Sequence, residues 1–335
     1  MTAENSTTKV KEFVFVSFTN KPVLKIILFL VILIFYMATL MGNIGMIALI
    51  RASPQLHTPM YFFLSNLSFI DSLFSSVVAC KSLANFLEDK KLISFIGCAM
   101  QMYFVIGLGS AECFLLVAMA YDRYVAICKP LLYPVLMSPR ICFLLMAGSY
   151  LLGFSHSLLH TIFTFRLSFC RSEINHVYCD ITALLLLSCT DTHLNELLIF
   201  YVAGLVETTT LLSVFLSYIC ILANIVRISS ASGRLKAFST CTSHLIAVTI
   251  FHGAILILHF RPKSSNGSPI QDVSDKILSV FYTIVIPLLN PLIYSLRNKE
   301  VKDALRGLVK KAWLALITYF SSCWPKILKW AITSR

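Results

Sequence analysis

Long apolar stretches separated by short polar segments dominate the pattern of this chain. A helix needs about 20 largely apolar residues to cross a bilayer, and seven stretches reach that length. They are 26–50, 59–80, 92–120, 141–165, 197–226, 237–260 and 277–296. They are too long and continuous for outer-membrane strands, which give alternating segments of about 10 residues. The pattern predicts an all-α membrane protein, a bundle of seven transmembrane helices whose backbones satisfy their own hydrogen bonds.

The composition supports this prediction and excludes a soluble enzyme. Of 335 residues, 57% are apolar and 13% are charged, with a mean hydropathy of +0.80. A soluble domain has about 45–50% apolar and about 25% charged residues. The formal net charge is +12, but the charged residues stand singly between apolar runs. No basic domain is therefore available to bind nucleic acid.

The outer side of the membrane is indicated by one glycosylation sequence and by four cysteines. Asn5 begins an Asn-Ser-Thr triplet in the polar N-terminal segment, which we expect to be extracellular and glycosylated. With that orientation, Cys98, Cys170, Cys179 and Cys189 fall on the oxidising side. Four thiols allow three disulfide connectivities, and the sequence pattern alone leaves the choice open.

Three classes of protein fit seven spans: a receptor, a light-driven pump or channel, and a transporter or membrane enzyme. A retinal pump needs a lysine in its last span, and residues 277–296 contain none. His244, His252 and His259 share one face of the sixth span, but residues two turns apart lie about 10–12 Å apart along a helix. These three cannot all bind one ion, so we predict no metal site beyond a sodium site described below.

The inner ends of two spans carry specific motifs. Asp122-Arg123-Tyr124 follows the third span, where the carboxylate can hold the guanidinium in one state and release it in another. The last span ends in Asn290-Pro291-Leu292-Ile293-Tyr294, and Pro291 removes one helical hydrogen bond. We expect Asn290 to help satisfy the freed backbone group, which would make this position a hinge.

Four blocks of sequence resemble the odorant receptors, a branch of the rhodopsin-like (class A) G-protein-coupled receptors. The blocks are LHTPMYFFLSNLSFID (56–71), MAYDRYVAICKPLLY (119–133), KAFSTCTSHL (236–245) and PLLNPLIYSLRNKEV (287–301). The resemblance extends from about residue 10 to residue 308 and is greatest for the tetrapod-type class II branch. It implies an extracellular N-terminus, a cytoplasmic C-terminus and no enzymatic activity.

The resemblance also implies particular roles for buried and paired residues. It implies the disulfides Cys98–Cys179 and Cys170–Cys189. It places the family's core acidic pair at Asp71 and Glu112, which would carry protons or share a sodium ion that stabilises the inactive state. It suggests that Glu207, in the fifth span, lies near the ligand cavity or takes part in gating. The G-protein coupling and activation residues that it implies are Asp122, Arg123, Tyr124, Tyr218, Asn290, Pro291 and Tyr294.

A ligand cavity is expected between the outer halves of the third, fifth, sixth and seventh spans. Its third-span residues recur on one helical face, a pattern that equally suits helix packing. The resemblance places that face toward the odorant. The predicted lining residues are Met102, Val105, Ile106, Gly109, Ser110, Val202, Ala203, Val206, His252, Ile255, His259, Val280 and Thr283.

His252 departs from the family, which usually has tyrosine at this position. Together with His259 it could favour an acidic or aldehyde odorant, or the two rings could hydrogen-bond within the protein. The sequence leaves both interpretations open.

The resemblance implies a function and a set of partners. We expect a receptor for small volatile odorants that activates the heterotrimeric olfactory stimulatory G protein and raises cyclic AMP. An alternative is the same scaffold used outside the nose as a sensor of metabolites. We expect a multi-pass plasma-membrane protein of olfactory sensory neuron cilia, which depends on export chaperones and contacts membrane lipid. No cofactor is predicted other than a modulatory sodium ion.

The chain divides into four expected segments. Residues 1–23 form the extracellular tail, 24–296 the seven-helix receptor domain, and 297–311 a basic juxtamembrane helix. Residues 312–335 form an extension, whose uncharged part is too short to span the membrane. Its basic flanks and three tryptophans predict an amphipathic segment on the membrane surface.

Overall fold

The computed structural model describes residues 10–310, except residues 20, 89, 228, 261–268, 298–299 and 309. Side chains at 236, 239–240, 259–260, 269–272 and 296–297 are also outside the description. The predicted glycosylation residue Asn5, the extension 312–335 and the side chain of His259 therefore lie outside the described residues.

Seven helical segments in the described part of the chain are long and apolar enough to cross a membrane, which confirms the predicted seven-helix bundle. Two of them are composite, because each contains a short π-helical turn. The segments are α1 (Pro22–Ala52), α2 (Pro59–Leu87), α3 (Phe95–Cys128), α5 (Pro139–Phe165), α7 (His193–Leu198) with η3 (Ile199–Ala203) and α8 (Gly204–Val226), α9 (Ala231–Phe260), and α10 (Pro269–Val280) with η4 (Phe281–Val285) and α11 (Ile286–Arg297).

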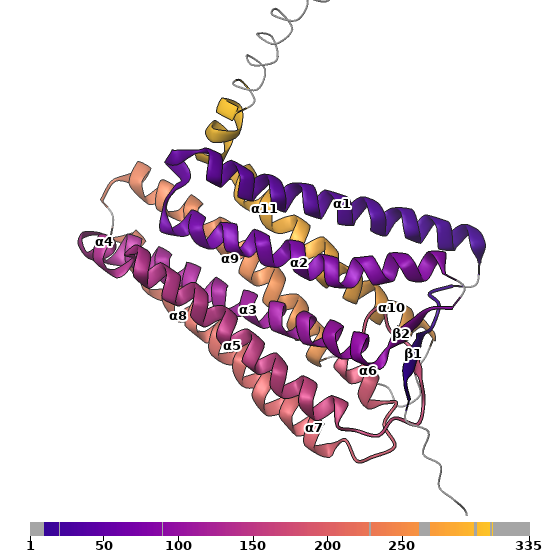
Figure 1. The fold of residues 1–335 in the computed structure, drawn as a ribbon. Helices are drawn as coiled ribbons and strands as arrows, with labels where there is room; N and C mark the ends of the chain where they lie inside the picture. The colour runs from indigo at the N-terminus through magenta and orange to yellow at the C-terminus, as the bar shows by residue number, and fades with distance from the viewer. Residues whose placement is uncertain are drawn as a thin grey trace, which may run out of the picture.

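Short elements lie between the long helices, at the two ends of the bundle. Figure 1 shows α6, β1 and β2 at one end, near the label of α10, and α4 at the opposite end. The end with β1 and β2 is the outer one, because it carries the N-terminal segment. The short elements are η1 (Pro54–Leu56), η2 (Pro130–Leu132), α4 (Tyr133–Leu136), α6 (Ile181–Leu185), β1 (Glu12–Phe15), β2 (Leu92–Ser94) and β3 (Glu173–Ile174).

Local sequence explains where several helices begin. Prolines occupy the first turn of α1, α2 and α5, where the missing N–H has no helical partner to lose. The Ser94 side chain accepts a hydrogen bond from the Gly97 amide at 3.0 Å and caps α3. The predicted third span began at residue 92, but residues 92–94 pair as strand β2, so the helix begins at Phe95.

A three-stranded sheet lies at the outer end of the bundle. β1 pairs with β2 antiparallel and with β3 parallel. Phe13 and Phe15 alternate with more exposed residues and are buried against Met102 and the disulfide cysteines Cys98 and Cys179. The expected extracellular tail therefore contains an ordered strand, which the hydropathy pattern did not predict.

Helix α3 is central to the bundle and packs closely against α5, α8 and α2. The two backbones come very close at Gly153 of α5, where an added Cβ atom would lie 2.5 Å from the Ala111 amide nitrogen and 2.8 Å from the Gly107 carbonyl oxygen. These are backbone atoms, so they cannot move aside without moving α3. Only glycine fits at this crossing.

We therefore expect Gly153→Ala to lower the free energy of unfolding by about 1–3 kcal/mol, because the added methyl group forces two packed backbones apart. Thermal unfolding of the purified protein measures the effect. Gly148→Ala is the matched control on the same helix, because nothing lies within 4 Å of the added Cβ. Equal unfolding temperatures for the two variants would contradict the assigned packing.

Candidate functional site

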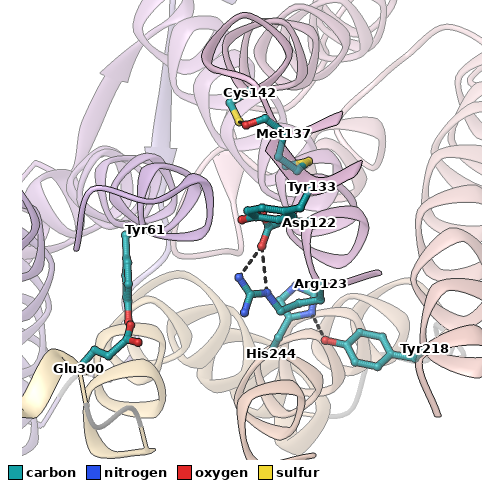
Figure 2. Close-up of polar contacts among 9 residues, drawn as sticks. All are labelled: Tyr61, Asp122, Arg123, Tyr133, Met137, Cys142, Tyr218, His244 and Glu300. Carbon is teal, nitrogen blue, oxygen red and sulfur yellow. Dashed lines mark hydrogen bonds and ion pairs between the residues drawn. The ribbon is translucent and has the colours of Figure 1, made fainter. Parts of the chain in front are cut away.

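An ion pair at the inner end of α3 is the first part of the site (Figure 2). The Arg123 Nε donates to the Asp122 Oδ2 at 3.0 Å, and its Nη2 donates to the same oxygen. The Asp122 side chain is fully buried and that of Arg123 is nearly so. On the other side, the Tyr133 hydroxyl donates to Asp122 Oδ1 at 2.8 Å. Asp122 thus holds Arg123 and is itself held by α4.

Tyr133 lies in the inner loop and remains a hydrogen-bond donor there. Its burial raises the pKa of the phenol above the usual value, and the neighbouring Asp122 carboxylate raises the pKa further. The phenol therefore keeps its proton at physiological pH. Sequence reasoning did not assign Tyr133 a role, although it belongs to the quoted 119–133 block.

A second polar contact joins α8 to α9 beside Arg123. The Tyr218 hydroxyl and the His244 Nδ1 are 2.8 Å apart, and both side chains are buried. Figure 2 shows the pair next to Arg123. The buried Tyr294 hydroxyl has no hydrogen-bond partner among the described residues. The predicted coupling residues Arg123 and Tyr218 therefore lie together with His244, which had been considered only as a metal ligand.

The remaining inner residues link other helices. The Tyr61 hydroxyl donates to Glu300 Oε2 at 2.7 Å, which connects α2 to the helical residues 300–308 that follow α11. Tyr124 is half-buried, and the Lys129 Nζ lies 5.8 Å from the centre of its ring. These contacts surround the ion pair with side chains from the inner half of the bundle.

The carbonyl group that Pro291 leaves without a helical partner is satisfied by a residue of another helix and not by Asn290. Pro291 cannot donate to the carbonyl of Pro287, four residues earlier. The Asn43 Nδ2 donates to that oxygen at 2.9 Å. Asn290 was expected to satisfy the freed group, and this was wrong: its amide turns toward the bundle interior instead. A side chain from another helix was needed, and the motif alone could not show it.

The amide of Asn290 contacts both members of the acidic pair. Its Nδ2 lies 3.0 Å from Asp71 Oδ2 and 3.3 Å from Glu112 Oε1. All three side chains are at most 3% exposed. The structure thus brings Asp71 and Glu112 to one buried point on three helices. Two ionised carboxylates so close together repel each other, so a proton or a cation must neutralise at least part of their charge.

The predicted odorant-lining residues occupy several packing environments. Met102 and Ile106 pack in the outer cluster under the sheet, whereas Val105 and Ile255 pack in the main core. Val280 contacts the main core, and residues 202, 203 and 206 are half-buried on η3 and α8. Contact with an odorant stays a prediction for all of them.

The polar and small members of the predicted lining have partners within the protein. The Ser110 hydroxyl lies 2.8 Å from His156 Nδ1 on α5. The Thr283 hydroxyl donates to the Ser279 carbonyl one turn earlier, at 2.7 Å. A Cβ added at Gly109 would lie 3.0 Å from the Tyr282 hydroxyl. Spacing along the helix could not reveal these neighbours.

His252 makes an internal hydrogen bond, which favours one of the two interpretations left open above. Its Nδ1 lies 2.8 Å from Glu207 Oε1, and its side chain is 1% exposed. Glu207 also accepts a weak contact from the Cys113 thiol, with sulfur and oxygen 3.9 Å apart. The sequence analysis suggested that Glu207 lies near the ligand cavity or in the gate, but it identified neither partner.

A shallow open hollow lies at the outer end, near α1 and α2, and none of the predicted odorant residues lines it. Its lining combines aromatic, hydroxyl and basic side chains. The lining residues are Phe15, Val16, Ser17, Phe18, Thr19, Lys25, Ser82, Asn85, Phe86, Lys91, His176 and Val177.

Both disulfides that the resemblance implies are present, and they fix the long outer loop. The Cα atoms are 5.5 Å apart in Cys98–Cys179 and 5.4 Å apart in Cys170–Cys189. Gln101, one turn from Cys98, accepts a hydrogen bond from the Cys179 amide at 3.0 Å. The loop is therefore attached to the outer end of α3 by a covalent bond and a hydrogen bond.

His176 attaches the same loop to α10 and gives it a dependence on pH. Its Nε2 lies 2.9 Å from the Ser279 hydroxyl. Burial lowers the pKa of the imidazole below its usual value of 6.5. The folded protein therefore binds this proton more weakly than the unfolded chain, and folding stability falls as the pH drops below about 6.5.

We expect a lower unfolding temperature at pH 5.5 than at pH 7.5, with a smaller difference in His176→Gln. Thermal unfolding of the purified receptor at the two pH values measures this. His193→Gln replaces an exposed histidine and should keep the full difference. An unchanged pH dependence in His176→Gln would show that His176 does not contribute to it.

Comparisons with known proteins agree on one family. The family profile described as "Olfactory receptor" matches residues 32–311. Mouse olfactory receptor 5AR1 is 54% identical over 303 residues, which are 90% of this chain and 96% of the relative. Human olfactory receptor 5AR1 is 52% identical, over 93% of this chain and 99% of the relative. Mouse olfactory receptor 8U9 is 53% identical, over 92% and 97%.

Proposed function

This chain belongs to the olfactory receptor family, and from that premise we propose that it detects small volatile odorants and activates the olfactory stimulatory G protein, which raises cyclic AMP. Its family consists of G-protein-coupled odorant receptors that are not enzymes, and its seven apolar helices belong to a multi-pass plasma-membrane protein. The chemical class of the ligand and the choice of G protein are the proposed parts.

The observation that carries the proposal is the Arg123–Asp122 pair at the inner end of α3. A ligand that binds an open state of the bundle better than a closed one shifts the equilibrium by that difference in affinity. Arg123 held by a buried carboxylate fits the closed state. Opening would separate α9 from α3, free Arg123 and expose a groove for a helix of the G protein.

The odorant would bind among the predicted lining residues in the outer half of the bundle. Most of these are apolar, as suits a small volatile molecule, and a few polar groups would orient it. Ser110, Thr283, His252 and His259 are the proposed orienting groups. The hydrogen bonds that the first three make within the protein would have to rearrange or be shared with the ligand.

A sodium ion or protons would neutralise the Asp71–Glu112 pair in the inactive state. The pair is buried, and the Asn290 amide is the donor that contacts both carboxylates. A sodium ion bound there would oppose the rearrangement of α2, α3 and α11 and so stabilise the inactive receptor.

We expect that replacing potassium by sodium in the medium lowers odorant potency severalfold in the wild-type receptor. Glu112→Gln removes one carboxylate of the pair and should remove the sodium effect. Concentration–response curves for cyclic AMP in membranes with the two salts measure this. Glu196→Gln, on the exposed side of α7, is the matched control. A sodium effect retained in Glu112→Gln would show that sodium acts away from the Asp71–Glu112 pair.

The test of the proposed function is a cyclic AMP screen of varied volatiles in cells that express the receptor, export chaperones and the olfactory G protein. Surface staining normalises each response. We expect a concentration-dependent rise that disappears when the G protein is omitted. A ligand response carried by an inhibitory G protein or by calcium release without cyclic AMP would contradict the proposed coupling. Truncation after residue 311 in parallel tests the predicted membrane-surface role of the extension.

A further inference from the structure

Three side chains of different chemistry meet between α3, α8 and α9. They are Cys113, Glu207 and His252, and one ligand atom from each lies within 4.8 Å of the others. The closest pair is His252 Nδ1 and Glu207 Oε1, at 2.8 Å, and the Cys113 sulfur is 3.9 Å from Glu207 Oε2. Cys113 is 3% exposed, Glu207 9% and His252 1%. Cys113 directly follows Glu112 of the Asp71–Glu112 pair, whereas Asp122 and Arg123 lie more than two helical turns further along α3.

This cluster contains unused bonding capacity on two of its members. An ionised carboxylate has about four acceptor positions, yet Glu207 accepts one strong hydrogen bond, from His252, and one weak contact from a thiol. The buried His252 Nε2 has no partner among the described residues. Buried polar atoms are normally satisfied, so this set of atoms suits an additional ligand.

The donor set matches the coordination chemistry of zinc. Thiolate, imidazole and carboxylate are its usual protein ligands, at about 2.3, 2.0–2.1 and 2.0–2.2 Å from the ion. Tetrahedral angles then put the ligand atoms about 3.3–3.7 Å apart. The distances in the cluster fall on both sides of that range, so side-chain shifts of about 1 Å would complete the site.

Charge also favours a divalent ion at this depth in the membrane. An isolated charge in an apolar environment is costly. One divalent cation with one carboxylate, one thiolate and a neutral imidazole has a net charge of zero. Binding would release the proton of the thiol, which becomes the thiolate ligand.

We propose that Cys113, Glu207 and His252 form a binding site for a zinc-class divalent ion, with water as the fourth ligand. The ion would connect α9 to α3 and α8 in the middle of the bundle. The site does not depend on the identity of the odorant or of the G protein. Spacing along the sixth span points only to His244, His252 and His259, and cannot reveal a site whose ligands come from three helices.

Cobalt(II) is a spectroscopic probe for such a site. We would titrate the purified full-length receptor in detergent with cobalt(II) and record its absorption. The expected result is saturation at one equivalent, with visible bands of a tetrahedral ion and a near-ultraviolet band from the cobalt–thiolate bond. Zinc should displace the cobalt and remove both signals.

Three variants distinguish a metal site from a hydrogen-bonded Glu207–His252 pair. Cys113→Ser should remove the thiolate band and weaken cobalt binding at least tenfold. The control Cys241→Ser replaces a buried free cysteine on α9, and it should keep the thiolate band and the wild-type affinity. His252→Tyr introduces the residue usual in the family, so it should fold and lose binding. Thermal unfolding without metal checks that each variant is folded.

Two outcomes would overturn the proposal. One is the lack of a saturable cobalt spectrum in the folded wild-type receptor, which would leave Glu207 and His252 as a hydrogen-bonded pair. The other is a thiolate band that Cys113→Ser retains, which would place the ion elsewhere. Neither result depends on signalling, so the failure of this proposal and the failure of the proposed function are distinguishable.

Discussion

Arg123→Ala is expected to abolish odorant-evoked cyclic AMP while the receptor still reaches the cell surface. Arg123 is the charged group that the closed state holds against Asp122 and that opening would release toward the G protein. Alanine removes every hydrogen bond that this guanidinium could make to a partner. We expect the maximal response per surface receptor to fall by more than about tenfold.

The control for this variant is Arg140→Ala, which removes an exposed arginine at the inner end of α5. It should keep the response. Removal of Arg123 leaves the buried Asp122 without its charged partner, which can also impair folding. Surface staining of both variants therefore separates a loss of coupling from a loss of folded receptor. A full response in Arg123→Ala at normal surface level would show that the Asp122–Arg123 pair does not control coupling.

Cys98→Ser is expected to reduce the amount of receptor at the cell surface severalfold. The Cys98–Cys179 bond joins positions 81 residues apart and is fully buried under the outer sheet. Loss of a native disulfide typically costs about 2–5 kcal/mol, and smaller losses already change cellular abundance severalfold. Staining of intact cells against total receptor measures the change.

Cys80→Ser is the matched control for the disulfide variant. Cys80 is an exposed free cysteine on α2, and its replacement should leave the surface level unchanged. Cys179→Ser should match Cys98→Ser, and the double variant should be no worse than either single one. Additive losses would mean that the two cysteines act separately rather than as a bond.

The sequence was sufficient to predict the number and order of the transmembrane helices. Each span is a long apolar run, and the membrane imposes one minimum length on all of them. The exact ends were less predictable, because they depend on local contacts. Residues 92–94 pair with β1, and Ser94 caps α3, so the helix begins at Phe95. The apolar run that predicts this helix therefore starts three residues too early. β1 itself has only four residues, too few for a clear alternating pattern.

The candidate site was predictable only where one motif contains it. Asp122 and Arg123 belong to one motif, from which their ion pair was predicted. The Tyr218–His244 contact and the Asn43 contact to the Pro287 carbonyl join different helices. Their geometry depends on how each helix is rotated about its axis, which hydropathy does not encode.

Activation of the olfactory stimulatory G protein through Arg123 is tested most directly by nucleotide exchange on the purified G protein, catalysed by purified receptor in lipid vesicles. The probe is an odorant from the cyclic AMP screen, added at several concentrations. We expect the odorant to accelerate the binding of a non-hydrolysable GTP analogue to the G protein with the wild-type receptor and not with Arg123→Ala. Odorant binding to the wild-type receptor with no acceleration of exchange would contradict this expectation.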